Sequence, residues 1–130
     1  MEDVVVLDTD ILFAFLGDLE TAAETEKILL AGKGSISSIT VYELFRGVES
    51  KKHLKQRRSL LSYLHSIDLT TSIAREAGLL YTLLRKKGLT VSNEDILIAA
   101  ACIHDNIPLF TGNRKHFESM PGLRLYNAVV

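Results

Sequence analysis

The chain has 130 residues, of which 47% are hydrophobic and 24% charged, and this composition suits one soluble globular domain spanning residues 1–130. Its apolar runs fall short of the ~20 residues that cross a bilayer. Glu2 and Asp3 stand where a secretory signal carries basic residues, so we expect a cytoplasmic protein without a membrane segment. The net charge of -1 argues against a protein that coats DNA without specificity.

Charge is distributed unevenly along the sequence. Eight of the 16 acidic residues lie within the first 26 positions. Ten of the 15 basic residues form three short groups, within residues 51–58, 85–87 and 114–115. Such groups usually cover solvated helix faces, but they also suit contact with a polyanion.

The first half of the chain predicts strands that alternate with helices. The run VVVL at residues 4–7 is short, apolar and β-branched, which is typical of a central parallel strand covered on both faces. We expect a short helix from Ile11, capped by Asp10, and then a helix over residues 19–31 that Gly32 ends. Further elements are expected as a strand at 34–38, a helix from near Thr40 and a basic helix at 53–66.

The second half continues the alternation. Its helices are predicted over residues 72–87, from Ser92 onward and, as a short turn, over 114–118. Its strands are predicted at 67–69, 107–111 and 123–127. Parallel neighbours need a crossover long enough to hold a helix, so this order predicts a three-layer α/β/α sandwich with a mainly parallel sheet of four to five strands.

Polar residues from distant segments fall at one edge of the predicted sheet, beyond the carboxyl ends of the strands, where open α/β sheets bind ligands. Asp8 directly follows the first strand, Glu43 lies one turn into a helix, and Asp95 opens another helix. Thr111 and Asn113 follow the fourth strand. Several carboxylates at one edge repel one another unless a proton or a cation compensates them. Oxygen ligands without a histidine or cysteine cluster favour Mg²⁺ or Mn²⁺ over zinc.

Each acidic residue also has a purely structural explanation. Thr40 with Glu43, and Ser92 with Asp95, fit helix capping boxes, and Asp8 fits a turn. The single cysteine lies in an apolar run and predicts a buried, unreactive thiol. The four histidines show no paired ligand spacing, so we expect them to be exposed or partly buried.

The acidic edge and the basic groups together suit nuclease chemistry. A carboxylate-held Mg²⁺ can lower the pKa of a bound water and orient it for in-line attack on a phosphodiester. Basic groups around the site would hold a nucleic-acid strand by salt-sensitive phosphate contacts. Neither a G-x-S-x-G motif nor a G-x-x-x-x-G-K-[ST] loop occurs in the sequence.

Four blocks of the sequence resemble, in order and spacing, the PIN-domain ribonucleases of the VapC toxin type. They are VVLDTDILF, SSITVYELFRGV, SNEDILIAAACIHDNIPLFTGNRKHF and PGLRLYN. The resemblance runs from about Val4 to Tyr126. It implies a small α/β/α domain that holds Mg²⁺ or Mn²⁺ through an acidic cluster and cuts RNA, and an antitoxin protein from the adjacent gene that blocks it.

Carried over by position, the resemblance assigns the roles of individual residues. Asp8, Glu43 and Asp95 match the first three acids, which hold the metal, and Thr111 matches the hydroxyl residue after the fourth strand. Asn113 stands where many members carry a fourth aspartate, so we expect one firm metal site and a second ion recruited by substrate, with Asn113 as a further candidate ligand. Asp10 stands where asparagine or serine is frequent, and it either joins the metal ligands or organises the turn.

Apolar residues of the first helix and of the segment GLLYTLL exceed what one small core needs. Core packing accounts for most of them, and together with the resemblance the remainder predicts a homodimer face. The resemblance therefore implies RNA, an antitoxin and a second copy of the chain as partners.

Two other interpretations of the sequence stay open. The opening motif also resembles that of haloacid-dehalogenase-type phosphatases, in which Asp8 would be phosphorylated. That mechanism needs a lysine near a strand end, whereas Lys86 and Lys87 fall in a helical stretch. A non-catalytic PIN-like module that binds RNA or a protein is the second alternative, because position 113 lacks a carboxylate.

Overall fold

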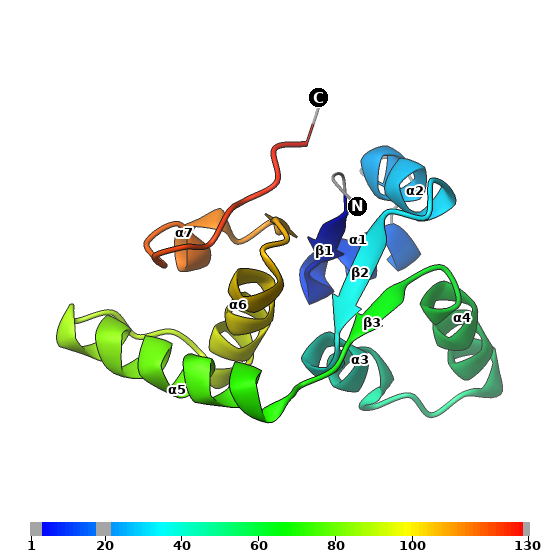
Figure 1. The fold of residues 1–130 in the computed structure, drawn as a ribbon. Helices are drawn as coiled ribbons and strands as arrows, with labels where there is room; N and C mark the ends of the chain where they lie inside the picture. The colour runs from blue at the N-terminus through cyan, green and yellow to red at the C-terminus, as the bar shows by residue number, and fades with distance from the viewer. Residues whose placement is uncertain (1–3, 18–21, 129–130) are drawn as a thin grey trace.

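The computed structural model of the protein describes residues 4–17 and 22–128. Figure 1 shows the strands and helices alternating along the chain. In chain order they are β1 (Val5–Leu7), α1 (Thr9–Gly17), α2 (Ala23–Leu30), β2 (Gly34–Ser37), α3 (Ser38–Phe45), α4 (Lys51–Leu61), β3 (His65–Ile67), α5 (Thr71–Lys86), α6 (Asn93–Asp105), β4 (Leu109–Phe110) and α7 (Arg114–Phe117).

Within the described residues, four strands form one parallel sheet in the order β3-β2-β1-β4. The register places Val6 beside Ser35 of β2 and Leu109 of β4. The chain runs outward from β1 through β2 to β3 and then returns to add β4 on the other side of β1. β1 and β4 therefore flank the point where the strand order reverses, and the crevice there is where open α/β sheets bind ligands.

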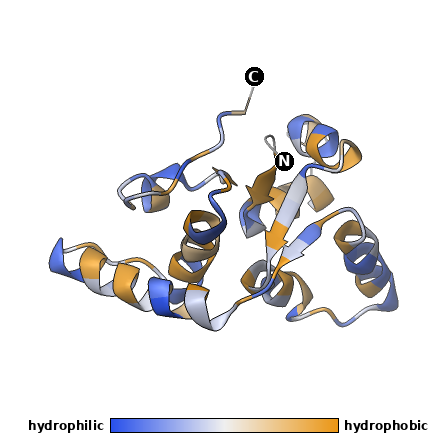
Figure 2. Ribbon diagram, viewed as in Figure 1, coloured by the Kyte–Doolittle hydropathy of each residue, from blue (hydrophilic) through white to orange (hydrophobic). Residues whose placement is uncertain are grey.

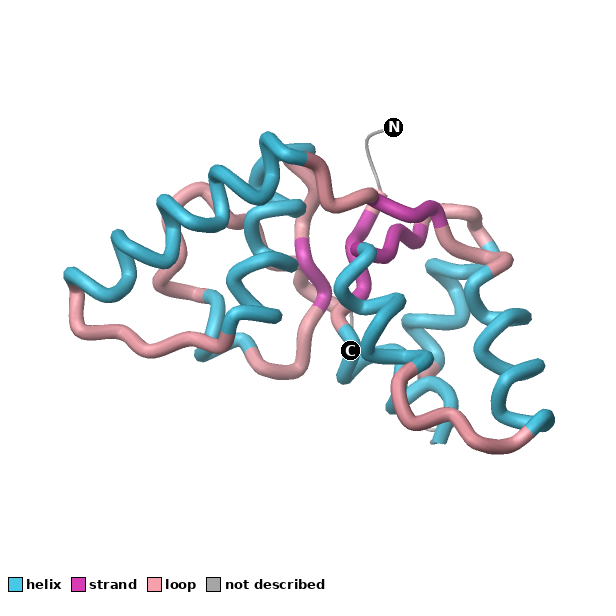
Figure 3. Tube along the Cα trace, turned by 90° about the horizontal axis from the view of Figure 1, so that it is seen from below, coloured by secondary structure: helices cyan, strands magenta, loops and turns pink. Residues whose placement is uncertain are grey.

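Strand β1 is buried between two helical layers, as its apolar run predicts. Val5 and Leu7 pack into a core with residues of α1 to α4, whereas Val6 packs into a second core built mainly by α5, α6 and α7. Figure 1 shows α6 on one side of the sheet and α2 and α4 on the other, and Figure 3 shows the strands between the same two groups of helices. The expected three-layer α/β/α arrangement is confirmed.

Short polar side chains fix where the helices begin. Ser37, Ser50, Thr70 and Ser92 each accept a hydrogen bond from the backbone N–H three residues later, at the starts of α3, α4, α5 and α6. A cap of this kind contributes about 1 kcal/mol. At its end, α6 closes with Asn106 in the left-handed region, at φ 54°. The caps at Ser37 and Ser92 thereby fix the starts of the helices that carry Glu43 and Asp95.

The third strand lies earlier than the sequence predicts. The expected strand was residues 67–69, but β3 is His65–Ile67, and α4 ends at Leu61 instead of continuing to Ser66. β3 is an edge strand, and its His65 and Ser66 side chains are exposed. Its sequence therefore carries no apolar alternation that could reveal it.

The predicted fifth strand at 123–127 is reduced to a single parallel bridge between Leu125 and Leu109. The Leu109 N–H donates to Arg124 O at 2.9 Å, and the Tyr126 N–H donates to Leu109 O at 2.8 Å. Because β4 has only two residues, it offers too short an edge for a longer ladder.

Helix starts also differ from expectation in the N-terminal half. α3 begins at Ser38 because Ser37 caps it, so Thr40 lies inside the helix. α2 begins at Ala23, and the earlier part of the helix predicted from residue 19 lies largely outside the described residues. In the described part of the chain, we find no helix with the length and apolarity that a bilayer span needs.

Candidate active site

The ends of β1 and β4 are joined by two buried side chains. Asp8, the first residue after β1, and Thr111, the first after β4, are each 4% exposed. The Thr111 hydroxyl donates to Asp8 Oδ2 at 2.7 Å, and the Thr9 N–H donates to Asp8 Oδ1 at 2.8 Å. Both carboxylate oxygens of Asp8 are thereby fixed in place at the reversal point of the sheet.

The ionised form of Asp8 is disfavoured in this environment. Burial raises the pKa of Asp8 to about 7, the hydrogen bonds from Thr111 and the Thr9 backbone oppose the shift, and the charges of Asp10 and Asp95 raise it further. The three carboxylates therefore act on one another electrostatically, although Asp95 lies far away in the sequence. A cation at this edge would relieve that repulsion.

Asp10 is tied to the loop that follows β4. Its Oδ2 accepts a 2.9 Å hydrogen bond from the Gly112 N–H, and a Cβ at position 112 would lie 2.6 Å from the same oxygen. Its Oδ1 is buried and has no hydrogen-bond partner within the described part of the chain. The expected role as cap of a helix from Ile11 is wrong, because α1 already begins at Thr9.

Glu43 reaches the site through a hydroxyl that the sequence analysis did not single out. Thr9 Oγ1 lies 2.5 Å from Glu43 Oε1 and 3.2 Å from Thr40 Oγ1. The predicted capping box of Thr40 and Glu43 is wrong, because Ser37 Oγ accepts from the Thr40 N–H and the Glu43 carboxylate is bonded to Thr9. The only sequence signal for Thr9 is its place between the two aspartates of DTD.

Asp95 is held from two sides. Its N–H donates to Ser92 Oγ at 3.2 Å, as the capping box predicts, and its Oδ2 lies 3.3 Å from Nδ1 of His116. Asn113 is exposed and contributes its backbone, since its N–H donates to Thr111 Oγ1 at 3.0 Å while its side chain does not cap α7. The contact with His116 was not foreseen, and no motif in the sequence points to it.

The oxygen ligands at this edge suit a divalent cation, but they do not already surround a common point. Across residues 4–17 and 22–128, no three acidic, histidine or cysteine side chains converge closely enough to hold a metal ion. The oxygen donors, the unpartnered Asp10 Oδ1 and the destabilised charge of Asp8 nevertheless fit Mg²⁺ or Mn²⁺. A bound cation would have to draw the acidic side chains together.

The remaining reactive groups are a buried thiol and exposed histidines, of which His116 contacts Asp95. Cys102 is 1% exposed, and burial raises the pKa of its thiol, so its predicted structural role is confirmed. All four histidines are exposed, as expected. Figure 2 shows hydrophilic residues along α4 and at the end of α5. Of the three basic groups, only Arg114 and Lys115 directly follow the acidic edge in sequence.

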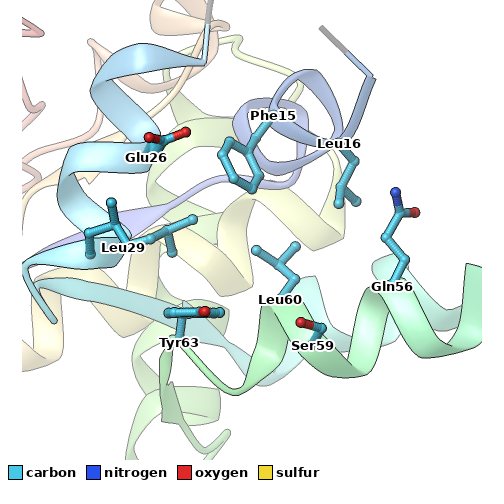
Figure 4. Close-up of a pocket in the computed structure, with 9 residues that line it drawn as sticks. Phe15, Leu16, Glu26, Leu29, Gln56, Ser59, Leu60 and Tyr63 are labelled. Atoms are coloured by element: carbon cyan, nitrogen blue, oxygen red, sulfur yellow. The ribbon is translucent and has the colours of Figure 1, made fainter. Parts of the chain in front are cut away.

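A separate apolar groove of about 530 Å³ lies between α1, α2 and α4. Figure 4 shows Phe15, Leu29 and Leu60 pointing into it from the three helices. Its lining residues are Phe15, Leu16, Glu26, Leu29, Leu30, Gln56, Ser59, Leu60 and Tyr63. Leu30 and Tyr63 are 69% and 50% exposed, so the groove offers apolar side chains that the chain itself leaves uncovered.

Known proteins and a family model are similar to this chain over most of its length. A family model described as PIN domain matches residues 5–123. The ribonuclease VapC2 of Rickettsia felis is 35% identical, over 95% of this chain and 97% of that protein. The ribonuclease VapC1 of Methanocaldococcus jannaschii is 27% identical, over 97% of this chain and 89% of that protein.

Solved structures show the same similarity. The crystal structure of VapBC2 from Rickettsia felis bound to a promoter DNA fragment contains a chain with a TM-score of 0.78 and 34% identity, covering 97% of this chain and 99% of that one. DNA-bound VapBC from Salmonella typhimurium has a chain with a TM-score of 0.80 and 25% identity, covering 95% and 96%.

Proposed function

The chain belongs to the PIN-domain family of VapC ribonucleases, and from this premise we propose that it is a divalent-metal-dependent endoribonuclease, the toxin of a toxin–antitoxin pair. The observation that carries the proposal is the buried Asp8, bonded to Thr111 where the strand order reverses and destabilised by Asp10 and Asp95. An acidic group held there at an energetic cost is explained by a function that needs its negative charge.

Each residue of the edge has its own part in this proposal. Asp8, Glu43 and Asp95 would hold Mg²⁺ or Mn²⁺, with Asp10 and Asn113 as further candidate ligands. When bound, the cation supplies a water of lowered pKa and neutralises charge on the leaving oxygen. The Thr111 hydroxyl orients Asp8, and the Thr9 hydroxyl orients Glu43.

The decisive experiment compares two aspartate variants on a broad RNA panel with Mg²⁺ or Mn²⁺. Asp8→Asn should abolish cleavage and relieve growth inhibition on expression. The matched control is Asp68→Asn, at an exposed position between β3 and α5, which should cleave like the unsubstituted protein. Absence of cleavage by the unsubstituted protein, or full activity of Asp8→Asn, would contradict the proposal.

Metal binding separates the nuclease from the alternative of a non-catalytic module. Mn²⁺ should raise the melting temperature of the unsubstituted protein and raise that of Asp8→Asn much less. A module without a metal site would show no stabilisation in either. The phosphatase interpretation is not proposed, because Lys86 is the last residue of α5 and the family assignment leaves it without support.

We assign the apolar groove between α1, α2 and α4 to the antitoxin. The solved relatives are toxin–antitoxin complexes, and a groove with an apolar floor and polar groups such as Glu26 and Gln56 among its lining suits an amphipathic helix. Leu30→Arg places a charge in the groove at a residue that is 69% exposed, so folding should be preserved. It should abolish inhibition by the antitoxin and leave RNA cleavage unchanged.

The proposed homodimer face lies elsewhere, on α5. Leu79 and Leu83, one turn apart on one face of this helix, are 67% and 40% exposed. Leu79→Arg should dissociate the dimer in analytical ultracentrifugation and leave inhibition by the antitoxin unchanged. Leu30→Arg should leave the dimer intact and abolish inhibition by the antitoxin. Because Leu79 and Leu30 are almost equally exposed, each variant is the control for the other.

A further inference from the structure

A smaller cavity, of about 250 Å³, adjoins the acidic edge. One wall is the loop between α5 and α6, including Leu89, Val91 and Ser92, and the other wall carries Lys115 and Ser119, within and just after α7. Asp95 and His116 also line it. The cavity thus shares Asp95 with the acidic edge, where this residue acts electrostatically on Asp8.

We propose that this cavity is a nucleotide subsite, which holds one ribonucleotide beside the scissile phosphate of a single-stranded RNA, with Lys115 binding its phosphate. The inference rests on the proposed function and adds to it where the substrate lies. In this proposal the RNA strand runs from the acidic edge toward α7 and away from the apolar groove.

The size and lining of the cavity favour a single nucleotide. At about 250 Å³ it lies just below the ~300–1,000 Å³ of pockets that enclose drug-sized ligands, so it suits a nucleotide that stays partly open to solvent and leaves no room for a protein helix. Leu89 and Val91 give it an apolar surface for a base, and Ser92 and Ser119 give it hydroxyls for the polar edges of a base or ribose. Contacts with aliphatic side chains and hydroxyls would not select one base, so the subsite would tolerate different sequences.

The positive charge of Lys115 also supports a nucleotide subsite in this cavity. The acidic edge repels phosphate, so a substrate needs cationic side chains close to it. Lys115 is the lysine that lines this cavity, and it is exposed and free to reach a phosphate. The basic residues at the end of α5 and along α4 do not line the cavity.

His116 links the cavity to the acidic edge. Its Nδ1 lies 3.3 Å from Asp95 Oδ2, so the ring bridges α7 and the start of α6. A nucleotide in the cavity would therefore lie beside a positioned Asp95. We assign His116 a positioning role at this rim, and the phosphate contact to Lys115.

The test measures binding separately from cleavage. Anisotropy of a fluorescein-labelled single-stranded oligoribonucleotide is followed on the Asp8→Asn protein, with Lys115→Gln or Ser119→Phe added. Each addition should weaken binding about tenfold, and Lys115→Gln should reduce the slope of log affinity against log salt by about 0.7, the share of one phosphate contact in a single strand. Lys27→Gln, at an exposed lysine of α2 outside the three basic groups, should bind like the parent, and Ser119→Ala, which removes the hydroxyl but leaves the cavity open, should weaken binding less than Ser119→Phe.

Cleavage by the otherwise unsubstituted protein gives the matching readout. Lys115→Gln should raise KM about tenfold and leave kcat within twofold, because it removes a binding contact and no reacting group.

Unchanged affinity, salt slope and KM in both Lys115→Gln and Ser119→Phe would overturn the subsite, and RNA cleavage by these variants would leave the nuclease proposal intact. Loss of cleavage by the unsubstituted protein, with binding that still depends on Lys115, would overturn the nuclease proposal alone. Weakened antitoxin inhibition with unchanged RNA binding would assign the cavity to the antitoxin and overturn the subsite.

Discussion

Thr111 donates a 2.7 Å hydrogen bond to Asp8 although 103 positions separate the two residues. The bond joins the ends of the adjacent strands β1 and β4 in a buried place, where each side chain is 4% exposed. It favours the ionised carboxylate, but burial and the neighbouring acids outweigh it and hold the pKa of Asp8 at about 7. Without a cation, the first acid of the site is thus close to half protonated at neutral pH.

The first prediction concerns stability and pH. The folded pKa of Asp8 lies above its unfolded value of 3.8, so the folded state binds more protons between pH 4 and 7. The free energy of unfolding therefore falls as pH rises through this range, by on the order of 3–4 kcal/mol, and levels off at about pH 8, one unit above the folded pKa. Asp8→Asn removes the buried charge, and its melting temperature should exceed that of the parent by a margin that widens until about pH 8.

Thermal denaturation at several pH values in EDTA measures this margin. Other titrating groups cancel because both proteins carry them, and Asp68→Asn controls for loss of an exposed charge. Saturating Mn²⁺ should reverse the order at pH 8, since the ion stabilises only a protein whose carboxylate binds it. A margin that does not change with pH would contradict the raised pKa.

A second prediction concerns the close approach of Gly112 to Asp10. In Gly112→Ala the new Cβ would lie 2.6 Å from Asp10 Oδ2, so either the Asp10 carboxylate turns away and loses its bond to the Gly112 N–H or the loop after β4 shifts. Cleavage should fall at least tenfold. Gly78→Ala, in the middle of α5 with no atom near its Cβ, should keep full activity and gain about 0.5–1 kcal/mol of stability.

The double variant Asp10→Ala with Gly112→Ala supplies the test of cause. Removing the carboxylate removes the clash. A fluorescent label on the loop after β4 reports the position of this loop, so its fluorescence should change in Gly112→Ala and return close to that of the parent in the double variant. Stability should follow the same pattern, because the two positions are in direct contact and their effects do not add. Additive losses would show that Gly112 acts through something other than Asp10.

The sequence predicts the central features of the fold because local patterns carry them. The apolar run of β1 predicts a strand buried on both faces, and Ser92 indicates the start of α6. The edge strand β3 has no such pattern, because its pairing with β2 through backbone groups determines it. A segment whose side chains face solvent gives no hydrophobic period to read.

The site residues also divide into those that local sequence patterns place and those that tertiary contacts place. The position of Asp8 after β1 could be predicted, since a strand end and a parallel sheet are enough to place it. The bond between Thr9 and Glu43 spans 34 positions and depends on how α3 packs beside α1. The capping-box pattern favoured a local role for Glu43, and this local rule was overridden by a tertiary contact with Thr9. Such contacts cannot be read from spacing alone.

A third prediction uses the buried thiol. Cys102 is 1% exposed among the α6 residues of the core, and burial raises the pKa of its thiol above the ordinary range. Reaction with a thiol reagent at pH 8 should therefore proceed only through unfolding, at a rate that follows added urea. Cys102→Ala should retain RNA cleavage. Rapid labelling in the absence of denaturant would contradict the burial.

The last prediction concerns Thr9, which holds Glu43 by its hydroxyl. Thr9→Val keeps the shape of the side chain and removes the donor, so Glu43 loses a fixed orientation and cleavage should fall by about ten- to a hundredfold, the usual cost of losing an outer-shell partner of a metal ligand. Thr9→Ser restores the hydroxyl and should recover most of the activity. The loss should appear as a higher Mn²⁺ concentration for half-maximal rate, with unchanged RNA binding. If excess Mn²⁺ failed to restore the rate of Thr9→Val, Thr9 would act on the reaction by a route other than the orientation of a metal ligand.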